Sequence, residues 1–394
     1  MITFDEALAL LAGAVQPLAA EEVALVDADG RVLAEPVHAA LDAPRRAVSA
    51  MDGYALRDVD AAIGARLRVI GQSFAGGELP PPLGASECVR IFTGAALPVG
   101  ADRVVMQENC TAEADLMTIA REYGPGWHVR AAGSDFHAGD VLLEAGRLLD
   151  PGAIVTLAGA DRGSALVYRA PAMAIIATGD ELAPPGTARG NPLAIPESVS
   201  FGVAALARQH GARIAARLTG GDDLGGLKAL AGQALDRADV VVVTGGASVG
   251  ERDFAKAMFG DHGLDLLFPK VAIRPGKPVW LGRTAGRWVL GLPGNPTSAM
   301  VTARLFLVPL LTALQGRAIG EVLDWEARPS SGALPATGDR MTFWRARAAS
   351  VGLEPVSNQD SGAQATLAAA RWLIRTEPGE PPVRPGQIVQ ALRL

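Results

Sequence analysis

The chain has 394 residues, of which 49% are hydrophobic and 20% are charged, and its formal net charge is −6. This length exceeds one ordinary globular domain and predicts about two to four domains. Because lysines and arginines are scattered through an acidic chain, the charge pattern argues against nucleic acid as a partner.

The N-terminal residues Met1–Glu6 contain no basic region followed by an apolar run, and no stretch approaches the ~18 consecutive apolar residues of a membrane span. The chain has two cysteines, Cys88 and Cys110, without metal-ligand spacing. Two isolated thiols in a long chain are typical of a reducing compartment. We therefore expect a cytoplasmic protein with neither a membrane partner nor a structural zinc site.

The sequence of the first 171 residues predicts short helices and strands. An amphipathic helix is expected over 3–16, because Thr3 and Glu6 fit a capping box and apolar residues recur at helical spacing. Short strands about an Asp29-Gly30 turn are expected over 22–37, and a strand- and turn-rich region over 42–140. A second helix is expected over 150–165.

The pattern changes at Ala172. Apolar runs occur at 174–177, 240–243 and 288–290, with a further strand near 213–218, and predicted helices at 198–210, 223–236 and 297–314 alternate with them. Continuous apolar strands alternating with helices indicate a mostly parallel sheet covered on both faces. We therefore predict a three-layer αβα domain over 172–317. After it, short strands at 343–348, 372–375 and 388–392 predict a small barrel or sandwich.

Three predicted strands of the αβα domain end in glycine-containing loops, where an open parallel sheet binds ligands. Glycine lets backbone N–H groups approach an anion, and neighbouring hydroxyls add donors. The candidate residues in these loops are Thr178, Gly179, Gly245, Gly246, Ser248, Gly250, Pro293, Gly294 and Pro296. The loops match neither a Walker A sequence nor a dinucleotide-binding fingerprint, which argues against kinases, ATPases and dehydrogenases. For any one loop, a simple tight turn remains an alternative.

Cations and carboxylates complete the set of candidates. Lys270, Arg274 and Lys277 lie in a segment stiffened by prolines, where they either bind phosphate or an oxyanion or decorate a solvated edge strand. Magnesium binds a few carboxylates together with ligand phosphates. The candidate carboxylates are Asp52, Asp135, Asp180, Glu181 and Asp253, and each could instead be an ordinary turn or cap residue.

Motifs extend over nearly the whole chain: Ser49-Ala50-Met51-Asp52-Gly53-Tyr54-Ala55, Phe92-Thr93-Gly94-Ala95, Gly100-Ala101-Asp102, Val105-Met106-Gln107-Glu108, Gly133-Ser134-Asp135, Thr178-Gly179-Asp180-Glu181-Leu182, Gly245-Gly246-Ala247-Ser248-Val249-Gly250, Pro275-Gly276-Lys277-Pro278 and Gly291-Leu292-Pro293-Gly294-Asn295-Pro296. In this order and spacing they resemble the molybdopterin molybdenumtransferase family, which includes the MoeA proteins and the E domain of gephyrin.

The resemblance implies an L-shaped homodimer with four domains per subunit. Their expected ranges are 1–41 with 141–171 for an elongated, discontinuous linking domain, 42–140 for a β-rich inserted domain, 172–317 for the αβα domain, and 318–394 for a small C-terminal β-barrel. The implied reaction takes adenylylated molybdopterin and molybdate, inserts molybdenum into the dithiolene, and releases AMP with magnesium. Implied partners are the adenylylating enzyme and client molybdoenzymes.

The resemblance also implies roles for individual residues. Asp52 and Asp135 would act across the subunit interface at the reacting end, and Thr93 and Gly94 would bind substrate or phosphate. Glu181, Ser248 and Asp253 would hold phosphate, metal or pterin, whereas Lys270, Arg274 and Lys277 would bind oxyanions. The C-terminal domain would close the pocket shaped by Pro293, Gly294 and Pro296 with Gln359 and Ser361.

The sequence departs from the family pattern at two positions. Where the family usually carries an Asp-x-Asn element, this chain has Ile195-Pro196-Glu197-Ser198, and Glu197 is the candidate replacement metal ligand. Asp360 stands beside Ser361 where a small residue is usual, and its charge would repel an oxyanion unless it is paired. These departures leave open a protein that binds or delivers the cofactor without turnover. A structural scaffold and a nucleotide amidohydrolase are further alternatives.

Overall fold

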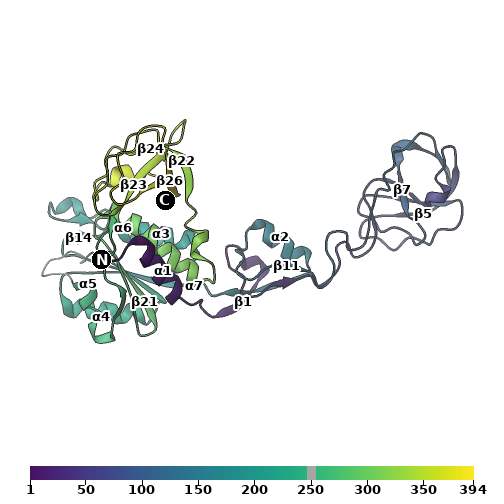
Figure 1. Cartoon of the computed structure of the whole chain (residues 1–394). Coiled ribbons are helices and arrows are strands. Elements are labelled where there is room, and N and C mark those ends of the chain that lie inside the picture. The colour runs from purple at the N-terminus through teal and green to yellow at the C-terminus, as the bar shows by residue number, and fades with distance from the viewer. Residues whose placement is uncertain (246–253) are drawn as a thin grey trace. The chain divides into compact units, whose positions relative to one another are not determined.

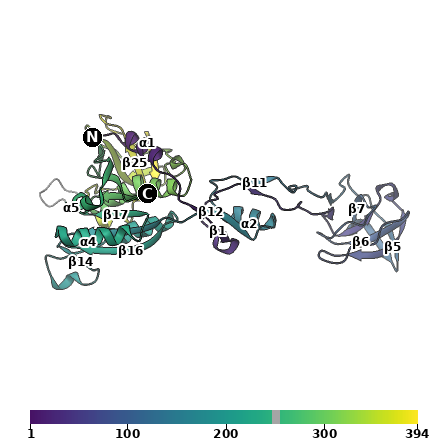
Figure 2. The same ribbon diagram turned by 90° about the horizontal axis from the view of Figure 1, so that it is seen from below.

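The computed structural model of the chain describes residues 1–245 and 254–394, which form two compact units. Unit 1 comprises Met1–Glu21, Gly30–Ala34 and Val167–Leu394, and unit 2 comprises Glu22–Asp29 and Glu35–Leu166. The chain passes between the units in β1 (Ala20–Ala24), after Asp29, after Ala34 and in β12 (Ser164–Tyr168) (Figures 1 and 2). The four domain ranges expected from the resemblance stay a prediction.

A six-stranded sheet forms the centre of unit 1, in the order β16-β13-β17-β21-β20-β18. Its strands are β13 (Ala172–Thr178), β16 (Arg213–Gly220), β17 (Val240–Thr244), β18 (Asp265–Phe268), β20 (Trp280–Thr284) and β21 (Arg287–Leu292). β13, β16, β17 and β21 are parallel, whereas β20 is antiparallel to both of its neighbours. The predicted mostly parallel sheet is therefore confirmed, together with an antiparallel strand that the sequence pattern did not indicate.

Alternate residues of the central strands pack into two separate cores. Ile175 and Val242 belong to the core that includes α3 (Val199–Gln209) and the long helix after β21, whereas Ile176 and Val243 belong to the core that includes α4 (Leu224–Leu235) and α5 (Phe254–Ala257). Burial on both faces explains why these strands have continuous apolar sequences and not an alternating pattern.

The long helix is α6 (Pro296–Thr302), a π-helical turn (Ala303–Leu307) and α7 (Val308–Leu314). Its 19 residues are long and apolar enough to cross a membrane, but 94% of it is buried within the structure. Because side chains of the same unit cover it, the helix is part of the core of unit 1.

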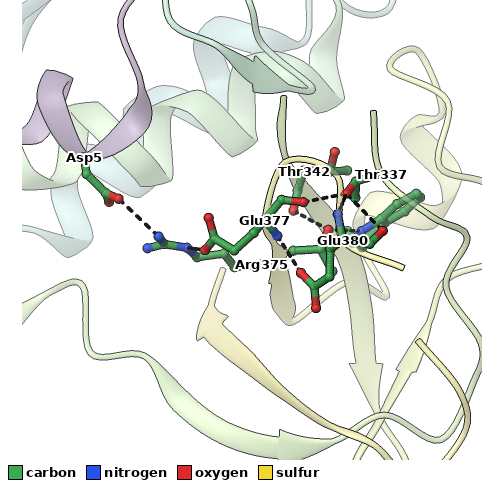
Figure 3. A network of polar contacts seen from close by, with 8 residues as sticks. Asp5, Thr337, Thr342, Arg375, Glu377 and Glu380 are labelled. Atoms are coloured by element: carbon green, nitrogen blue, oxygen red, sulfur yellow. Dashed lines mark hydrogen bonds and ion pairs between the residues drawn. The ribbon is translucent and has the colours of Figure 1, made fainter. Parts of the chain in front are cut away.

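The N-terminal helix α1 (Phe4–Ala14) packs against this same core. Its predicted capping box is present, since the N–H of Glu6 donates to Thr3 Oγ1 and the N–H of Thr3 donates to the Glu6 carboxylate. The Phe4 ring lies 5.1 Å from that of Phe343 in the C-terminal sheet. Asp5 forms an ion pair of 3.3 Å with Arg375 in the same sheet (Figure 3). The helix α1 therefore contacts the C-terminal sheet at two points.

The C-terminal sheet has the order β19-β23-β25-β26-β22, with β24 paired to β23. Its strands are β19 (Ile273–Arg274), β22 (Glu326–Pro329), β23 (Met341–Ala348), β24 (Leu353–Pro355), β25 (Trp372–Thr376) and β26 (Ile388–Arg393), and a short helix, α8 (Gln364–Leu367), precedes β25. The sheet is mixed because β19 is parallel to β23. The predicted strands are present, and closure into a barrel stays a prediction.

Unit 2 contains another six-stranded sheet, in the order β7-β4-β6-β5-β9-β8. Its strands are β4 (Gly53–Leu56), β5 (Arg66–Ser73), β6 (Glu87–Ile91), β7 (Arg103–Met106), β8 (Cys110–Glu113) and β9 (Leu116–Ile119). The unit also contains two short strand pairs and a helix: β2 (Val37–His38) with β11 (Val141–Leu143), β3 (Val48–Ser49) with β10 (Val129–Arg130), and α2 (Pro151–Gly159).

The C-terminal end of α3 makes the stability of unit 1 depend on pH. Burial, aided by the positive charges of Arg304 and Arg317, lowers the pKa of His210 from 6.5 to about 4. The unfolded chain therefore takes up a proton near pH 6.5 while the folded protein does not, so stability is full above that pH and is lost toward pH 4. We expect the free energy of unfolding to fall by about 2 kcal/mol between pH 7.5 and pH 5.

Urea unfolding of wild type and His210→Asn at both pH values measures this contribution. The variant removes the titrating group and is expected to lose less stability on acidification. Equal losses in the two proteins would contradict the assignment.

Candidate functional site

A cavity of about 540 Å³ lies at the carboxyl ends of the parallel strands of unit 1, and we call it the loop cavity. Residues from all three predicted loops line it: Thr178, Gly179 and Glu181 after β13, Thr244 and Gly245 at the end of β17, and Pro293, Gly294 and Pro296 after β21. The structure therefore brings together three loops, the first and last of which are more than 100 residues apart in the chain, at the end of the sheet where such folds bind ligands.

Glycine is required at the centre of this cavity. Gly245 has a φ of +94°, and a Cβ there would lie 2.4 Å from the carbonyl oxygen of Thr178. A Cβ on Gly294 would lie 3.3 Å from the Cα of Gly245, so two loops meet backbone to backbone. This close approach leaves backbone groups, and not side chains, to form part of the cavity wall.

Among the residues that the structure describes, three carboxylates line the loop cavity, those of Glu181, Glu197 and Asp222. Asp222 follows β16 and was missed by the sequence analysis. Among the described residues, no group of three or more acidic, histidine or cysteine side chains is arranged to hold a metal ion by itself. Hard oxygen donors on one cavity nevertheless fit magnesium, which uses one or two carboxylates and completes its shell with water and ligand phosphates.

Glu197 has two local hydrogen bonds that affect its predicted metal role. It follows β15 (Ile195–Pro196), which pairs with β14 (Leu182–Ala183), and its side chain is buried. Its carboxylate accepts from the N–H of Ser200 at 2.8 Å and from Ser200 Oγ at 2.6 Å. Both carboxylate oxygens of Glu197 therefore already accept hydrogen bonds from the first turn of α3. A metal ion bound by Glu197 would share these oxygens with Ser200.

A neighbouring cavity of about 340 Å³ is lined by cations, and we call it the cation cavity. Two of the three predicted basic residues line it, Arg274 and Lys277, together with Arg340 from the C-terminal sheet. Lys270 is exposed and is not among its lining residues. Pro278 lines both cavities, so the loop and cation cavities adjoin.

The loop after β21 is hydrogen-bonded to the C-terminal loop that carries Ser361. Asn295 Nδ2 donates to Ser361 Oγ at 2.9 Å, and the N–H of Thr297 donates to the Ser361 carbonyl at 3.1 Å. Thr297 Oγ1 donates to the Ala363 carbonyl at 3.2 Å. We call these three hydrogen bonds the clasp. They fix the loop after β21, which lines the loop cavity, relative to the Ser361 loop, which lines the cation cavity. Gln359, a further predicted residue, lines the cation cavity with Ser361.

Arg345 is hydrogen-bonded to the backbone of the loop that carries Ser361, and the sequence analysis did not identify this residue. Its side chain is buried, its Nη2 donates to the carbonyls of Asn358 and Asp360, and its Nε has no hydrogen-bond partner. Burial lowers the pKa of Arg345, whereas the charge of Asp360 acts in the opposite sense. The Asp360 carboxylate also accepts from the N–H of Gly362 at 2.7 Å, so the charge that departs from the family pattern is compensated locally.

In unit 2, Asp52 and Thr93 form a connected pair. Asp52 Oδ1 accepts from the N–H of Thr93 at 2.7 Å and from Thr93 Oγ1 at 2.8 Å. These two hydrogen bonds lower the pKa of Asp52, so the carboxylate is ionised at neutral pH. Gly94 completes the turn, with its N–H donating to the carbonyl of Ser49 at 2.8 Å.

Asp135 lies elsewhere in unit 2, where its N–H donates to the carbonyl of Ala43 at 2.9 Å and its side chain is exposed. Gly246, Ser248, Gly250 and Asp253, which the sequence analysis also named, lie outside the described residues.

Two protein families match the chain. The MoeA N-terminal region (domain I and II) matches residues 2–160, and a probable molybdopterin binding domain matches residues 174–313. The molybdopterin molybdenumtransferase of Haemophilus influenzae is 36% identical over 323 residues, covering 80% of this chain and 78% of its own. The enzyme of the same name from a Nostoc species is 36% identical over 317 residues, with 78% and 71% covered.

A crystal structure of the molybdopterin biosynthesis MoeA protein from Pyrococcus horikoshii has a TM-score of 0.85 to this chain at 29% identity, covering 100% of this chain and 99% of its own. The two matched families, the curated relatives and this structure agree with the order of the motifs and with the fold. The chain belongs to the molybdopterin molybdenumtransferase family.

Proposed function

We propose that this transferase of molybdenum cofactor biosynthesis acts on adenylylated molybdopterin and molybdate and releases AMP. In this reaction the dithiolene sulfurs of the pterin replace oxygen of molybdate, which leaves as water with the thiol protons, and a second water hydrolyses the phosphoanhydride and releases AMP. The observation that carries the proposal is the adjacency of the loop cavity and the cation cavity, which meet at Pro278. One suits a substrate rich in phosphate, and the other suits an oxyanion.

The loop cavity offers two kinds of support for phosphate. Gly245 and Gly294 bring the backbone to the cavity surface, and the long helix that begins at Pro296 points its N-terminal end there. Helix N-termini favour anions because their first N–H groups are unpaired and the macrodipole is positive at that end. Thr178 and Thr244 add hydroxyl groups to the lining.

Glu181 and Asp222 are the residues that we propose hold magnesium in the loop cavity, with Asp253 and Glu197 remaining further candidates. When bound, magnesium would neutralise charge on the phosphoanhydride and so make AMP a better leaving group. Without a bound cation the carboxylates repel phosphate, so they exclude anions from their side of the cavity.

Arg274 and Lys277 are the residues that we propose bind molybdate in the cation cavity. Ser361 lies on the same cavity and adds its hydroxyl group, whereas the Gln359 amide is hydrogen-bonded to the backbone of Arg345 and Val356 and so shapes the cavity wall. The segment that carries the cations is fixed at Gly276, whose φ is +102° and where a Cβ would lie 2.2 Å from Thr302 Cγ2. Preorganised charges of this kind bind an oxyanion without a large ordering cost.

A direct assay tests the function. Wild-type protein is incubated with adenylylated molybdopterin, molybdate and magnesium, and AMP and molybdenum-bound pterin are measured. We expect both products to require all three components. A protein that binds the pterin without forming AMP would instead support the cofactor-delivery alternative.

The resemblance further implies a homodimer in which Asp52 and Asp135 serve the partner's reaction, in a cytoplasmic setting with an adenylylating enzyme upstream and molybdoenzymes downstream. Complementation tests the sharing of residues. Asp52→Ala and Glu181→Ala homodimers are each expected to be nearly inactive, and mixing with subunit exchange is expected to restore about a quarter of wild-type AMP release, since half of the dimers then carry one intact site. No recovery despite exchange would contradict the sharing.

A further inference from the structure

One end of the unit 2 sheet gathers Asp52 together with aromatic and amide side chains that the proposed function does not use. Asp52 precedes β4, Phe74 follows β5 and Gln107 follows β7, while Phe92 and Thr93 follow β6. β4 is antiparallel to both β6 and β7, and β5 is parallel to β6. All four strand termini therefore lie at the same end of the sheet, and the ionised carboxylate of Asp52 lies among them.

Phe74 and Phe92 form a parallel stack at this end. Their ring centroids are 4.6 Å apart and their planes differ by 11°. The guanidinium of Arg90 lies over the Phe92 ring at 4.6 Å and over the Tyr54 ring at 5.1 Å. Since the Tyr54 side chain is buried, the stack is anchored at its inner end in the core of the unit.

Arg90 is held in place by further hydrogen bonds. Its Nη1 donates to the Gly53 carbonyl at 2.7 Å, and its Nη2 donates to Gln107 Oε1. Gln107 in turn donates its N–H to the carbonyl of Asp52 at 3.1 Å. The stacked rings and Asp52 are therefore parts of one rigid arrangement, connected through Arg90 and through the turn from Phe92 to Thr93.

The outer ring of the stack is open to solvent. Phe74 is 51% exposed, whereas Phe92 is partly buried. Many exposed apolar side chains need no explanation. Phe74 differs because its ring is aligned by a stack on one side and lies at the same sheet end as an ionised carboxylate and the Thr93 hydroxyl. A flat surface beside a hydrogen-bond acceptor is what a planar heterocycle with ring N–H or amino donors requires.

We infer that Phe74 and Phe92 form a stacking platform for a planar nitrogen heterocycle of the substrate. The inference rests on the proposed function, because adenylylated molybdopterin carries two such rings, the pterin and the adenine. Either ring would lie against the outer face of Phe74, and its amino group would donate to Asp52. The platform is thus a binding determinant and takes no part in the bond changes.

Substitution of Phe74 tests the platform in the full-length protein. Stacking of a base on an aromatic side chain contributes about 1–3 kcal/mol, so Phe74→Ala is expected to weaken the affinity for adenylylated molybdopterin by roughly 5- to 150-fold. KM should rise with kcat within about 3-fold, because the contact is the same in ground state and transition state. Phe74→Trp should retain wild-type affinity.

Trp127→Ala is the matched control. Trp127 is also exposed, at 49%, and also lies against an arginine, since Arg103 is 4.9 Å from its ring. Arg103 begins β7 and therefore marks the opposite end of the same sheet. The control variant should bind substrate as wild type does.

Equilibrium dialysis with AMP alone and with 2-amino-4-oxopteridine alone identifies the ring. Weaker binding of only AMP in Phe74→Ala assigns the adenine, and weaker binding of only the pteridine assigns the pterin. Unchanged affinity for the substrate and both probes overturns the inference, as does a change confined to the oligomeric state in sizing chromatography. If the wild-type protein binds substrate but releases no AMP, only the proposed function is contradicted. If the wild-type protein releases AMP and Phe74→Ala binds substrate with unchanged affinity, only the stacking platform is contradicted.

Discussion

Glu181→Gln is expected to reduce AMP release by roughly 10²- to 10³-fold, the size of effect seen when one preorganised electrostatic group is removed from a reacting centre. Glu181 is exposed at the end of β13 and lines the loop cavity with Asp222. Glutamine keeps the shape of the side chain but removes the charge that magnesium would need. Substrate affinity measured without magnesium should change little, whereas the magnesium concentration needed for half-maximal rate should rise.

Asp180→Asn is the control for this prediction. Asp180 precedes Glu181 and is also exposed, and its Oδ1 accepts from the N–H of Asp222 at 2.9 Å. Asparagine keeps that acceptor while it removes the same charge, so AMP release should stay within about 3-fold of wild type. Equal losses in both variants would show that net charge near the cavity, and not a specific ligand, controls the rate.

Lys277→Ala is expected to raise the molybdate concentration for half-maximal insertion by about 10- to 100-fold, since a charge-assisted hydrogen bond contributes about 1.5–3 kcal/mol. Lys277 lines the cation cavity with Arg274, Arg340 and Ser361. The effect should appear as a change in molybdate dependence at saturating pterin, with little change in the affinity for the pterin itself.

Lys270→Ala provides the comparison within the same segment. Both lysines are exposed and carry the same charge, but only Lys277 lines the cavity. Lys270→Ala should therefore leave the molybdate dependence near that of wild type. A large effect of Lys270→Ala with none of Lys277→Ala would reject the assignment of the cation cavity to molybdate.

The parts of the fold that could be predicted from sequence are those in which local pattern and burial agree. The capping box of Thr3 and Glu6 fixes the start of α1, and the valine run at 240–243 is buried on both faces as its composition indicates. β18 and β20 were not predicted, because a short strand at the edge of a sheet has no distinctive periodicity. Their antiparallel pairing depends on tertiary contacts.

In the candidate site, too, features with a local sequence pattern were predicted and features that depend on tertiary contacts were missed. Glycine-containing loops after continuous apolar strands indicated the loop cavity. Such strands are buried on both faces of a parallel sheet, and the loops at their carboxyl ends meet on one side of that sheet. Asp222 was missed since β16 is an edge strand with exposed residues such as Arg213 and Arg217, so its end did not stand out. Arg345 was missed because an arginine in a strand is ordinarily assigned to the surface, whereas here it is 1% exposed.

The clasp between Asn295, Thr297 and the Ser361 loop has a thermodynamic consequence. A ligand that orders one of the two loops also restricts the other through these three hydrogen bonds, so the entropy lost on binding is shared between the two cavities. The second ligand then binds to a loop that is already ordered, so its binding loses less conformational entropy. By linkage, the factor by which bound pterin strengthens oxyanion binding must equal the factor by which the oxyanion strengthens pterin binding, whichever arrives first.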